Sequence, residues 1–188
     1  MNTILARMIA LLLMVITCMA RTDEEKVAET RSAAEKGNAA AQFFVGLRYD
    51  VGADGYPKEP EQAAFWWKKS AAQEFPKAEV GLGELYLAGR GVRQDLTEAF
   101  KWFMRAARHG DSFSCLRVAI MYFEGQGVKS EPLMAYAWAS AYWTEDKLNL
   151  ERKRAFLDKV EAKLSEDQVR EAKRIAERIR LHIWDNSR

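Results

Sequence analysis

The chain has 188 residues, of which 29 are basic and 27 acidic, so its formal net charge at pH 7 is only +2. This balance argues against a general nucleic-acid-binding protein, because such proteins carry a strong basic excess or a basic face. Hydrophobic residues make up 48% and charged residues 30% of the chain, which is typical of a folded globular protein rather than a disordered one.

The first twenty residues differ from the rest of the chain. Arg7 precedes an uncharged apolar stretch over residues 8–16, and small residues around Ala20 follow it. This pattern predicts a signal peptide over residues 1–20, cleaved after Ala20, and therefore a secreted or periplasmic protein. The apolar stretch is shorter than the roughly 20 residues of a transmembrane helix. Two alternatives stay open, an uncleaved inner-membrane anchor or a lipoprotein acylated at Cys18, and we expect membrane contact only through this segment.

Residues 23–37 predict a helix that ends in Ala33, Ala34 and Gly37 and resembles the second helix of a unit. Lys26 and Glu29 stand where the later units carry alanine and tryptophan. Because the first unit of a repeat array needs a polar outer cover, we expect residues 23–37 to be an N-terminal capping helix.

The sequence then repeats itself with a period of 36 residues. The residues that return in step are Tyr86 and Tyr122, Gly89 and Gly125, Gly91 and Gly127, and Trp66, Trp102 and Trp138. A further copy lies 37 residues upstream, where Ala41, Gly46, Tyr49 and Gly52 match Ala78, Gly83, Tyr86 and Gly89. Periods of this length indicate a solenoid. We expect three units, over residues 38–77, 78–113 and 114–143.

Each unit predicts two helices joined by a glycine turn. Ala78, Leu82, Leu85 and Tyr86 have helical spacing in the first helix of the second unit, and Ala99, Trp102, Phe103, Ala106 and Ala107 have it in the second. Asp95 with Glu98 is an N-cap signature, and Pro60 and Pro132 fall in the first turn of the sister helices. Small pairs allow close approach of neighbouring helices, and each tryptophan is expected to fill the wedge between them.

The glycine pair at Gly89 and Gly91 could in principle cradle a phosphate. It has no preceding strand and no Lys-Ser/Thr after it, and it recurs in related form in every unit. Gly89 instead follows the last periodic residues of a helix, where a left-handed residue is needed. We therefore predict that these glycines end a helix and turn the chain.

The pattern resembles that of Sel-one-like repeats (SLR), a 36-residue relative of tetratricopeptide repeats. The residues that carry the resemblance are Ala78, Leu82, Gly83, Tyr86, Gly89, Gly91 and Val92, then Asp95, Ala99, Trp102, Ala106 and Ala107. The third copy departs from it at Ala119, Glu131 and Tyr142. The resemblance covers roughly residues 38–143 and implies an all-α, right-handed α/α solenoid of about three hairpins. The bacterial secreted or periplasmic type is the best match.

Residues 144–188 predict a C-terminal helix pair without the glycine turn. Thr144 is a candidate cap of the first helix, whose apolar residues are Leu148, Leu150, Phe156, Leu157, Val160 and Leu164. Ser165 and Gln168 form a capping box for the second, whose stripe is Val169, Ala172, Ile175, Ala176, Ile179 and Ile183. Such a pair would cover the last apolar face of the array, with Tyr142 and Trp143 packed against it.

No residue set predicts catalysis, a metal site or a cofactor. His109 and His182 lie far apart in sequence, and His109 is expected to be a favourable last-turn cation. Cys115 is the only cysteine beyond residue 20 and is expected to be a small buried hydrophobe. Some disulfide-rich SLR proteins are β-lactamase-like or penicillin-binding, but this chain lacks their paired cysteines. A β-lactamase-like hydrolase therefore stays only as a minor alternative.

The leading hypothesis is a non-enzymatic, monomeric scaffold in the bacterial cell envelope that binds another protein through a concave face of first helices. Four positions of the first helix vary between units while the frame stays fixed. They are 42/79/115, 44/81/117, 47/84/120 and 50/87/123. From these we choose Phe44, Arg117, Ile120 and Phe123 as an exposed anchor for the partner. The alternative is a peptidoglycan or glycan binder that uses exposed Trp67, Phe103 and Tyr136.

Overall fold

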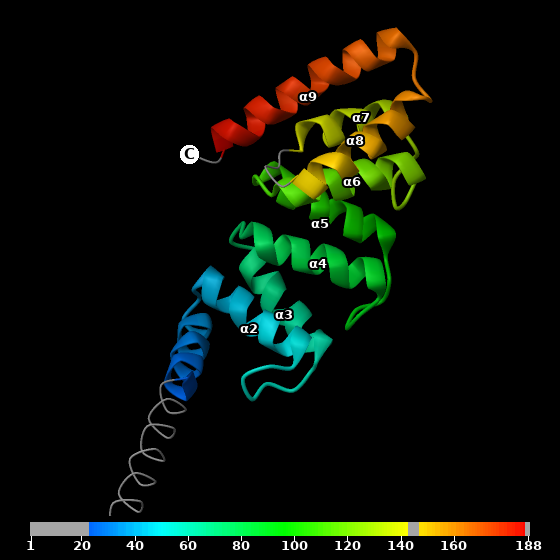
Figure 1. Ribbon diagram of the computed structural model, residues 1–188. Helices are drawn as coiled ribbons and strands as arrows, with labels where there is room; N and C mark the ends of the chain where they lie inside the picture. The colour runs from blue at the N-terminus through cyan, green and yellow to red at the C-terminus, as the bar shows by residue number, and fades with distance from the viewer. Residues whose placement is uncertain (1–22, 143–146, 187–188) are drawn as a thin grey trace, which may run out of the picture.

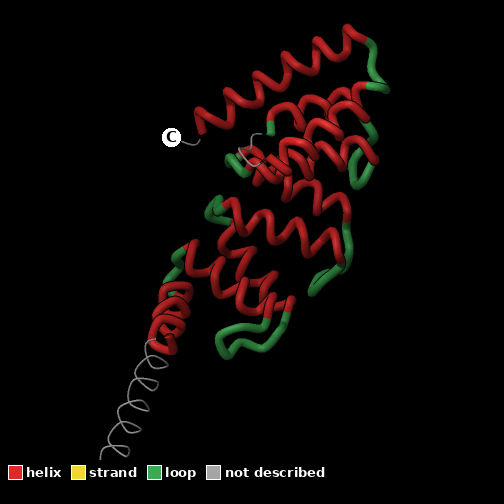
Figure 2. Tube along the Cα trace, viewed as in Figure 1, coloured by secondary structure: helices red, strands yellow, loops and turns green. Residues whose placement is uncertain are grey.

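A computed structural model of the chain describes residues 23–142 and 147–186, and this part is built from helices joined by turns (Figures 1 and 2). After an N-terminal helix over residues 23–35 come three hairpins. They are α2 (Ala39–Val51) with α3 (Pro60–Ala71), α4 (Pro76–Ala88) with α5 (Leu96–Arg108), and α6 (Ser112–Glu124) with α7 (Pro132–Ala141). Two further helices follow, α8 (Lys147–Glu161) and α9 (Glu166–Asn186).

The hairpins stack side by side in chain order, so the chain is an all-helical solenoid, as predicted (Figure 1). Each hairpin packs on itself and on the hairpin next in sequence. The small pairs lie at these contacts, where Ser70, Ala71, Ala106 and Ala107 are all fully buried. Because neither alanine nor serine holds the backbones apart, the second helix of one unit can lie close to the first helix of the next.

The glycine turns have the same backbone geometry in each unit. Gly52, Gly89 and Gly125 end their helices with left-handed φ angles of 74°, 66° and 73°. The backbone N–H groups of Glu59, Asp95 and Glu131 donate to the carbonyl oxygens of Tyr49, Tyr86 and Tyr122 at 2.9, 3.0 and 2.8 Å. The first loop is one residue longer than the other two, since the first unit is offset by 37 residues rather than 36, yet both ends of its turn are the same. The prediction that these glycines end a helix and turn the chain is confirmed.

The second glycine of the turn has a role that the sequence did not indicate. Gly91 has a φ of +64°, and a Cβ atom there would overlap the backbone of Pro60 and Glu61 at the start of α3. A Cβ at Gly127 would likewise overlap the backbone of Leu96 at the start of α5. Each loop thus lies against the second helix of the preceding unit, so this glycine fixes the spacing between units as well as the turn.

The caps of the second helices explain a departure in the third copy. Asp95 accepts a hydrogen bond from the backbone N–H of Glu98 at 3.0 Å, as predicted. Glu59 and Glu131 stand at the same position in the other units and make no side-chain cap, but a proline follows each of them at the first turn. Because proline has no N–H to satisfy and its φ suits a helix start, it replaces the missing cap.

The aromatic ring that packs against the helix glycines stands one residue after the repeating tryptophan, at position 67 in the first unit and 103 in the second. Trp67 is 4% exposed and Phe103 is fully buried. Trp67 packs between Gly46 of its own hairpin and Gly81 of the next, where a Cβ would come within 2.5 and 2.6 Å of the indole. Its Nε1–H donates to the Phe43 carbonyl at 3.1 Å. Phe103 meets Gly83 in the same way, so each helix glycine makes room for a ring.

This pairing explains why the third copy carries Ala119 where the others have glycine. The residue at the ring position of that unit is Ala139, and both alanines are fully buried. With no ring to accommodate, the first helix has space for a methyl group.

The repeating tryptophans have equivalent surroundings, each against the preceding unit. Trp66 packs with Ala34, Ala41 and Val45, Trp102 against the α3–α4 cluster, and Trp138 against the α5–α6 cluster. Trp66 and Trp138 are buried, whereas Trp102 is only partly buried. The expectation that this register supplies the main filling between units is therefore wrong for Trp102, because Trp67 is the buried ring of the cluster against which Trp102 packs.

The two ends of the array differ in how they are covered. At the N-terminal end Ala34 is buried against α2 and α3, and the outward residues of helix 23–35 are exposed. At the other end α8 and α9 pack mainly on α7 rather than on one another, and α9 crosses the end of the stack (Figure 1). Ser165 and Gln168 form the predicted reciprocal cap of α9, with bonds of 2.9 and 3.3 Å.

Several expectations for the C-terminal helices need correction or fall outside the described part. Leu148 and Leu150 are 54% and 40% exposed, so the apolar face of α8 begins only at Phe156. Tyr142 is buried as expected. Trp143 and Thr144, the segment 1–20 and the side chain of Ile183 lie outside what the structure describes.

Candidate interaction surface

The first helices of the three hairpins share one side of the solenoid, and α2 contributes an apolar stripe to it. Phe44, Leu47 and Val51 are 47%, 37% and 54% exposed. Their spacing of three and four residues places them on one face of the helix. We call these three residues the α2 stripe. Phe44 and Leu47 stand at positions that vary between units, and Val51 extends the same face by one turn.

Polar contacts lie beside the α2 stripe. Asp50 accepts hydrogen bonds from Arg90 at 2.8 and 3.4 Å, which joins the end of α2 to the turn of the second hairpin. Arg48 makes an ion pair with Asp54 at 2.7 Å. An apolar centre beside polar groups is the arrangement found in protein–protein interfaces.

Arg117, one of the four predicted anchor residues, links the first helix of its own unit, α6, to that of the preceding unit, α4. Its guanidinium lies 2.6 Å from the Glu84 carboxylate of α4 and is 5.8 and 5.3 Å from the ring centres of Phe103 and Phe113. These contacts hold the side chain in place across the gap between α4 and α6. Arg117 therefore supports the surface and has little freedom to reach a partner.

The other two predicted anchor residues are less accessible than expected. Ile120 is partly buried, and Phe123 is only 9% exposed. Phe156 of α8 packs edge-on against Phe123 at 5.7 Å, and Lys159 and Lys163 lie over its ring. The prediction of an exposed set is therefore wrong for Phe123, because α8 covers it. Phe44 lies on α2, two hairpins away from the three residues on α6.

The position shared by residues 42, 79 and 115 lies in the interior, which was expected of Cys115 but not of a position chosen as variable and open to a partner. Gln42 and Cys115 are 5% and 2% exposed, and Glu79 is fully buried. The Glu79 carboxylate meets Arg105 of α5 at 3.1 Å and Nδ1 of His109, the C-cap residue of α5, at 2.8 Å. His109 is thus a partner of a buried acid as well as the last-turn residue we predicted. The only sequence signal for it was a carboxylate in the core stripe of α4.

The glycan-binding alternative required three exposed rings, and the structure buries all of them. Trp67, Phe103 and Tyr136 are 4%, 0% and 5% exposed. The Tyr136 hydroxyl donates to Glu161 of α8 at 3.0 Å, and burial together with this carboxylate raises the pKa of Tyr136 to about 12. These rings stabilise helix contacts and cannot stack on a sugar, so this use of them is wrong.

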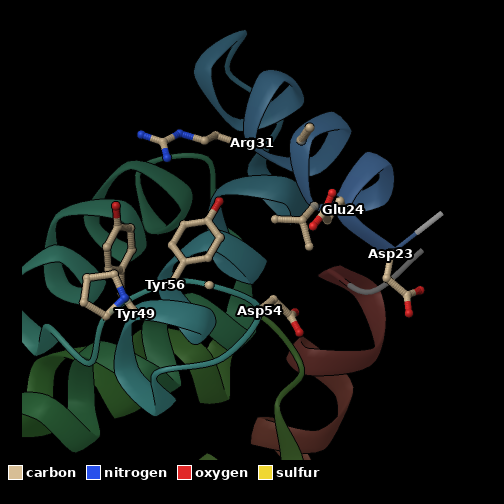
Figure 3. A pocket seen from close by; sticks show the side chains of 10 residues that line it. Asp23, Glu24, Arg31, Tyr49, Asp54 and Tyr56 are labelled. Carbon is tan, nitrogen blue, oxygen red and sulfur yellow. The ribbon is translucent and has the colours of Figure 1, made fainter. Parts of the chain in front are cut away.

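A cavity of about 450 Å³ opens between the N-terminal helix and the first glycine loop (Figure 3). Tyr49 and Tyr56 lie side by side on its loop side, with ring centres 4.8 Å apart, and Glu24 and Arg31 come from the helix. Burial raises the pKa of Tyr56, whose hydroxyl is buried without a hydrogen-bond partner. Asp54, which also lines the cavity, is paired with Arg48.

Other chemistry is equally weakly represented in the described residues. Over residues 23–142 and 147–186, no group of three or more His, Cys, Asp or Glu side chains is placed to hold a metal ion. The Cys115 thiol is buried, and burial raises its pKa to about 12, so it is not a reactive nucleophile. No helix in this part of the chain combines the length and the apolar character that crossing a bilayer requires.

Comparison with known proteins gives a family match and several relatives. The family model described as Sel1 repeat matches residues 39–75, 76–111 and 112–141, more than half of the chain, with each unit starting one or two residues from the predicted boundary. The chain is 34% identical over 119 residues to chitin synthase regulatory factor 3 of Schizosaccharomyces pombe, covering 62% of this chain and 13% of that protein.

Two more similarities extend the comparison. The ERAD-associated E3 ubiquitin-protein ligase component HRD3B of Arabidopsis thaliana is 35% identical over 99 residues, covering 52% of this chain and 15% of that protein. The crystal structure of a protective antigen of uropathogenic Escherichia coli with an SLR fold superimposes with a TM-score of 0.74 and 26% identity. That alignment covers 86% of this chain and 34% of the antigen. The chain thus spans a minor part of each relative.

Proposed function

The chain belongs to the Sel1-repeat family, and from this premise we propose that it is a non-enzymatic adaptor that binds another protein through its first helices. The observation that carries the proposal is the α2 stripe, three exposed apolar side chains on one helix face beside the Asp50–Arg90 and Arg48–Asp54 pairs. Exposed apolar residues grouped in this way commonly mark binding sites. Relatives named as a chitin synthase regulatory factor and as a component of a ubiquitin ligase support a role beside other proteins.

The packing of the repeats supports the adaptor proposal. The glycines, the small pairs and the rings of Trp67 and Phe103 fix the stacking, and they are buried or held in turns. Outward positions of the first helices are free of these constraints and differ between units. A rigid array therefore presents a surface whose side chains can suit one partner without disturbing the fold.

Replacement of Phe44 by a photo-crosslinking phenylalanine analogue is expected to give a discrete adduct with the partner in cells that produce the protein. Phe65 on α3 is the matched control, because it is 49% exposed against 47% for Phe44 but belongs to a second helix. We expect no adduct from position 65. The serine variant of Phe44 should bind the captured partner about 30-fold more weakly, as loss of a binding hot spot costs about 2 kcal/mol. Equal adducts from both positions would contradict the proposal.

We place this adaptor in the bacterial cell envelope, as a secreted or periplasmic protein released by cleavage after Ala20. The support is the basic start, short apolar centre and small-residue end of residues 1–20, together with the similarity to an E. coli protective antigen. Fractionation followed by mass spectrometry of the mature N-terminus is expected to find the chain in the periplasm or medium, beginning at Arg21. A chain recovered from the cytoplasm with its first residues intact would refute this placement.

A further inference from the structure

A cavity of about 550 Å³ lies between α5, α7 and α9, on the side of the second helices rather than on the first-helix surface. Its lining residues are Arg108, Trp138, Ile175, Arg178, Ile179 and His182. Among the residues whose side chains the structure describes, the lining contains no acidic side chain. It combines basic groups with an apolar wall, since Ile175 and Ile179 are partly buried beside Trp138.

The two arginines of this cavity differ from their neighbours on α9. Arg170 and Arg174 form ion pairs with acids one turn away on the same helix. Arg108 and Arg178 are exposed, and neither makes an ion pair within the part of the chain that the structure describes. Guanidinium groups present several donors in a plane, which suits the two oxygens of a carboxylate.

Trp138 provides an independent observation at the same place. The side chain is only 5% exposed, and its Nε1 atom is buried without an acceptor. A buried donor without a partner is unfavourable, and native proteins rarely leave one unless a ligand or water supplies the acceptor. Trp102 has the same unpaired Nε1, but only Trp138 lines this cavity.

We propose that the cavity binds a carboxylate carried by an apolar group. The carboxylate lies between Arg108 and Arg178 with one oxygen as the acceptor for Trp138 Nε1–H, and the apolar group lies against Ile175 and Ile179. The C-terminal residue of a peptide and an aliphatic acid both have this chemistry. A bare phosphate does not, because it would leave the apolar wall of the cavity unfilled. The site does not depend on the adaptor surface, which lies on other helices.

The test uses ¹⁵N-labelled protein and four probes. They are N-acetyl-L-leucine, octanoate, N-acetyl-L-leucinamide and inorganic phosphate. The two acids are expected to shift the indole N–H signal of Trp138, which the Trp138→Phe variant identifies by its absence. The amide and phosphate are expected to leave it in place. Preference for N-acetyl-L-leucine would identify a peptide C-terminus, and preference for octanoate an aliphatic acid, and either result supports the proposal.

Arg178→Gln is expected to weaken binding of the acids by about tenfold, since a charge-assisted hydrogen bond is lost. Arg170→Gln is the matched control, because this residue lies on the same helix about 12 Å away along its axis. Both residues are exposed, so neither variant should alter folding. Equal binding of acid and amide, displacement of the acid by equimolar phosphate, or unchanged binding by Arg178→Gln would each overturn the proposal.

Discussion

Replacement of Phe103 by alanine is expected to lower the free energy of unfolding by about 3–5 kcal/mol, the usual cost of removing a fully buried ring. The side chain is 0% exposed and lies among Ala99, Ala107, Val118 and Ala119 between the second and third hairpins. Its removal leaves a cavity at the contact that joins two units, and Arg117 loses one of the rings beneath its guanidinium. Urea unfolding followed by circular dichroism at 222 nm measures the change.

Trp102→Ala is the matched comparison, since Trp102 is adjacent in sequence and larger. The repeat pattern predicts that Trp102 fills the wedge between neighbouring helices. In the structure Trp102 is only partly buried, and Arg105 rather than core residues covers one face, 4.9 Å from the ring. We now expect a smaller loss than for Phe103→Ala. A larger loss at Trp102 would show that the repeating tryptophan, and not residue 103, carries the contact between units.

The same site allows a test of the pairing between ring and glycine. Gly83→Ala alone is expected to cost about 1–3 kcal/mol, because its Cβ would lie 2.7 Å from the Phe103 ring. In a Phe103→Ala background the added methyl group should cost much less, since that pair reproduces the natural Ala119–Ala139 arrangement. Additive losses in the double variant would contradict the proposed contact.

Gly91→Ala is expected to destabilise the protein by about 2–5 kcal/mol, for two separate reasons. The left-handed φ of +64° costs a non-glycine residue about 1–2 kcal/mol. The Cβ would also overlap the backbone of Pro60 and Glu61, and overpacking of this kind costs about 1–3 kcal/mol. Because the obstacle is backbone, no side-chain rotation can relieve it. Thermal and urea unfolding of the purified variant measure the loss.

Gly55→Ala separates these two reasons. Gly55 also has a left-handed φ, +78°, but nothing lies within 4 Å of the position that a Cβ would take. We expect this variant to show only the backbone cost of about 1–2 kcal/mol. If both variants lost the same stability, the contact between the loop and the preceding unit would contribute nothing, and Gly91 would be a turn residue alone.

Helices, turns and caps could be predicted well because the signals for them are local. Helical spacing, the proline starts, the Asp95 cap and the Ser165–Gln168 box each depend on residues a few positions apart. The 36-residue period added a long-range constraint, since equal units must stack in equal ways. The period thus predicted the solenoid without any need to locate individual contacts.

Accessibility could not be predicted in the same way. The glycan-binding alternative required Trp67 and Phe103 to be exposed, yet they face glycines on two helices. Phe123 was expected on an open surface, but its cover comes from α8, a helix outside the repeats. In each case the deciding neighbour lies many residues away, and the repeat pattern contains no information about it.

The sequence by itself determined the family, the number of units and the positions of their corners, because a period and its glycines act through local geometry. Only the tertiary structure decided which rings are buried, why Gly91 cannot carry a side chain, and which side chains of the first helices stay exposed. Burial depends on the packing of units and of the terminal helices against one another. A side chain's exposure is therefore a property of the assembled array and not of its own repeat.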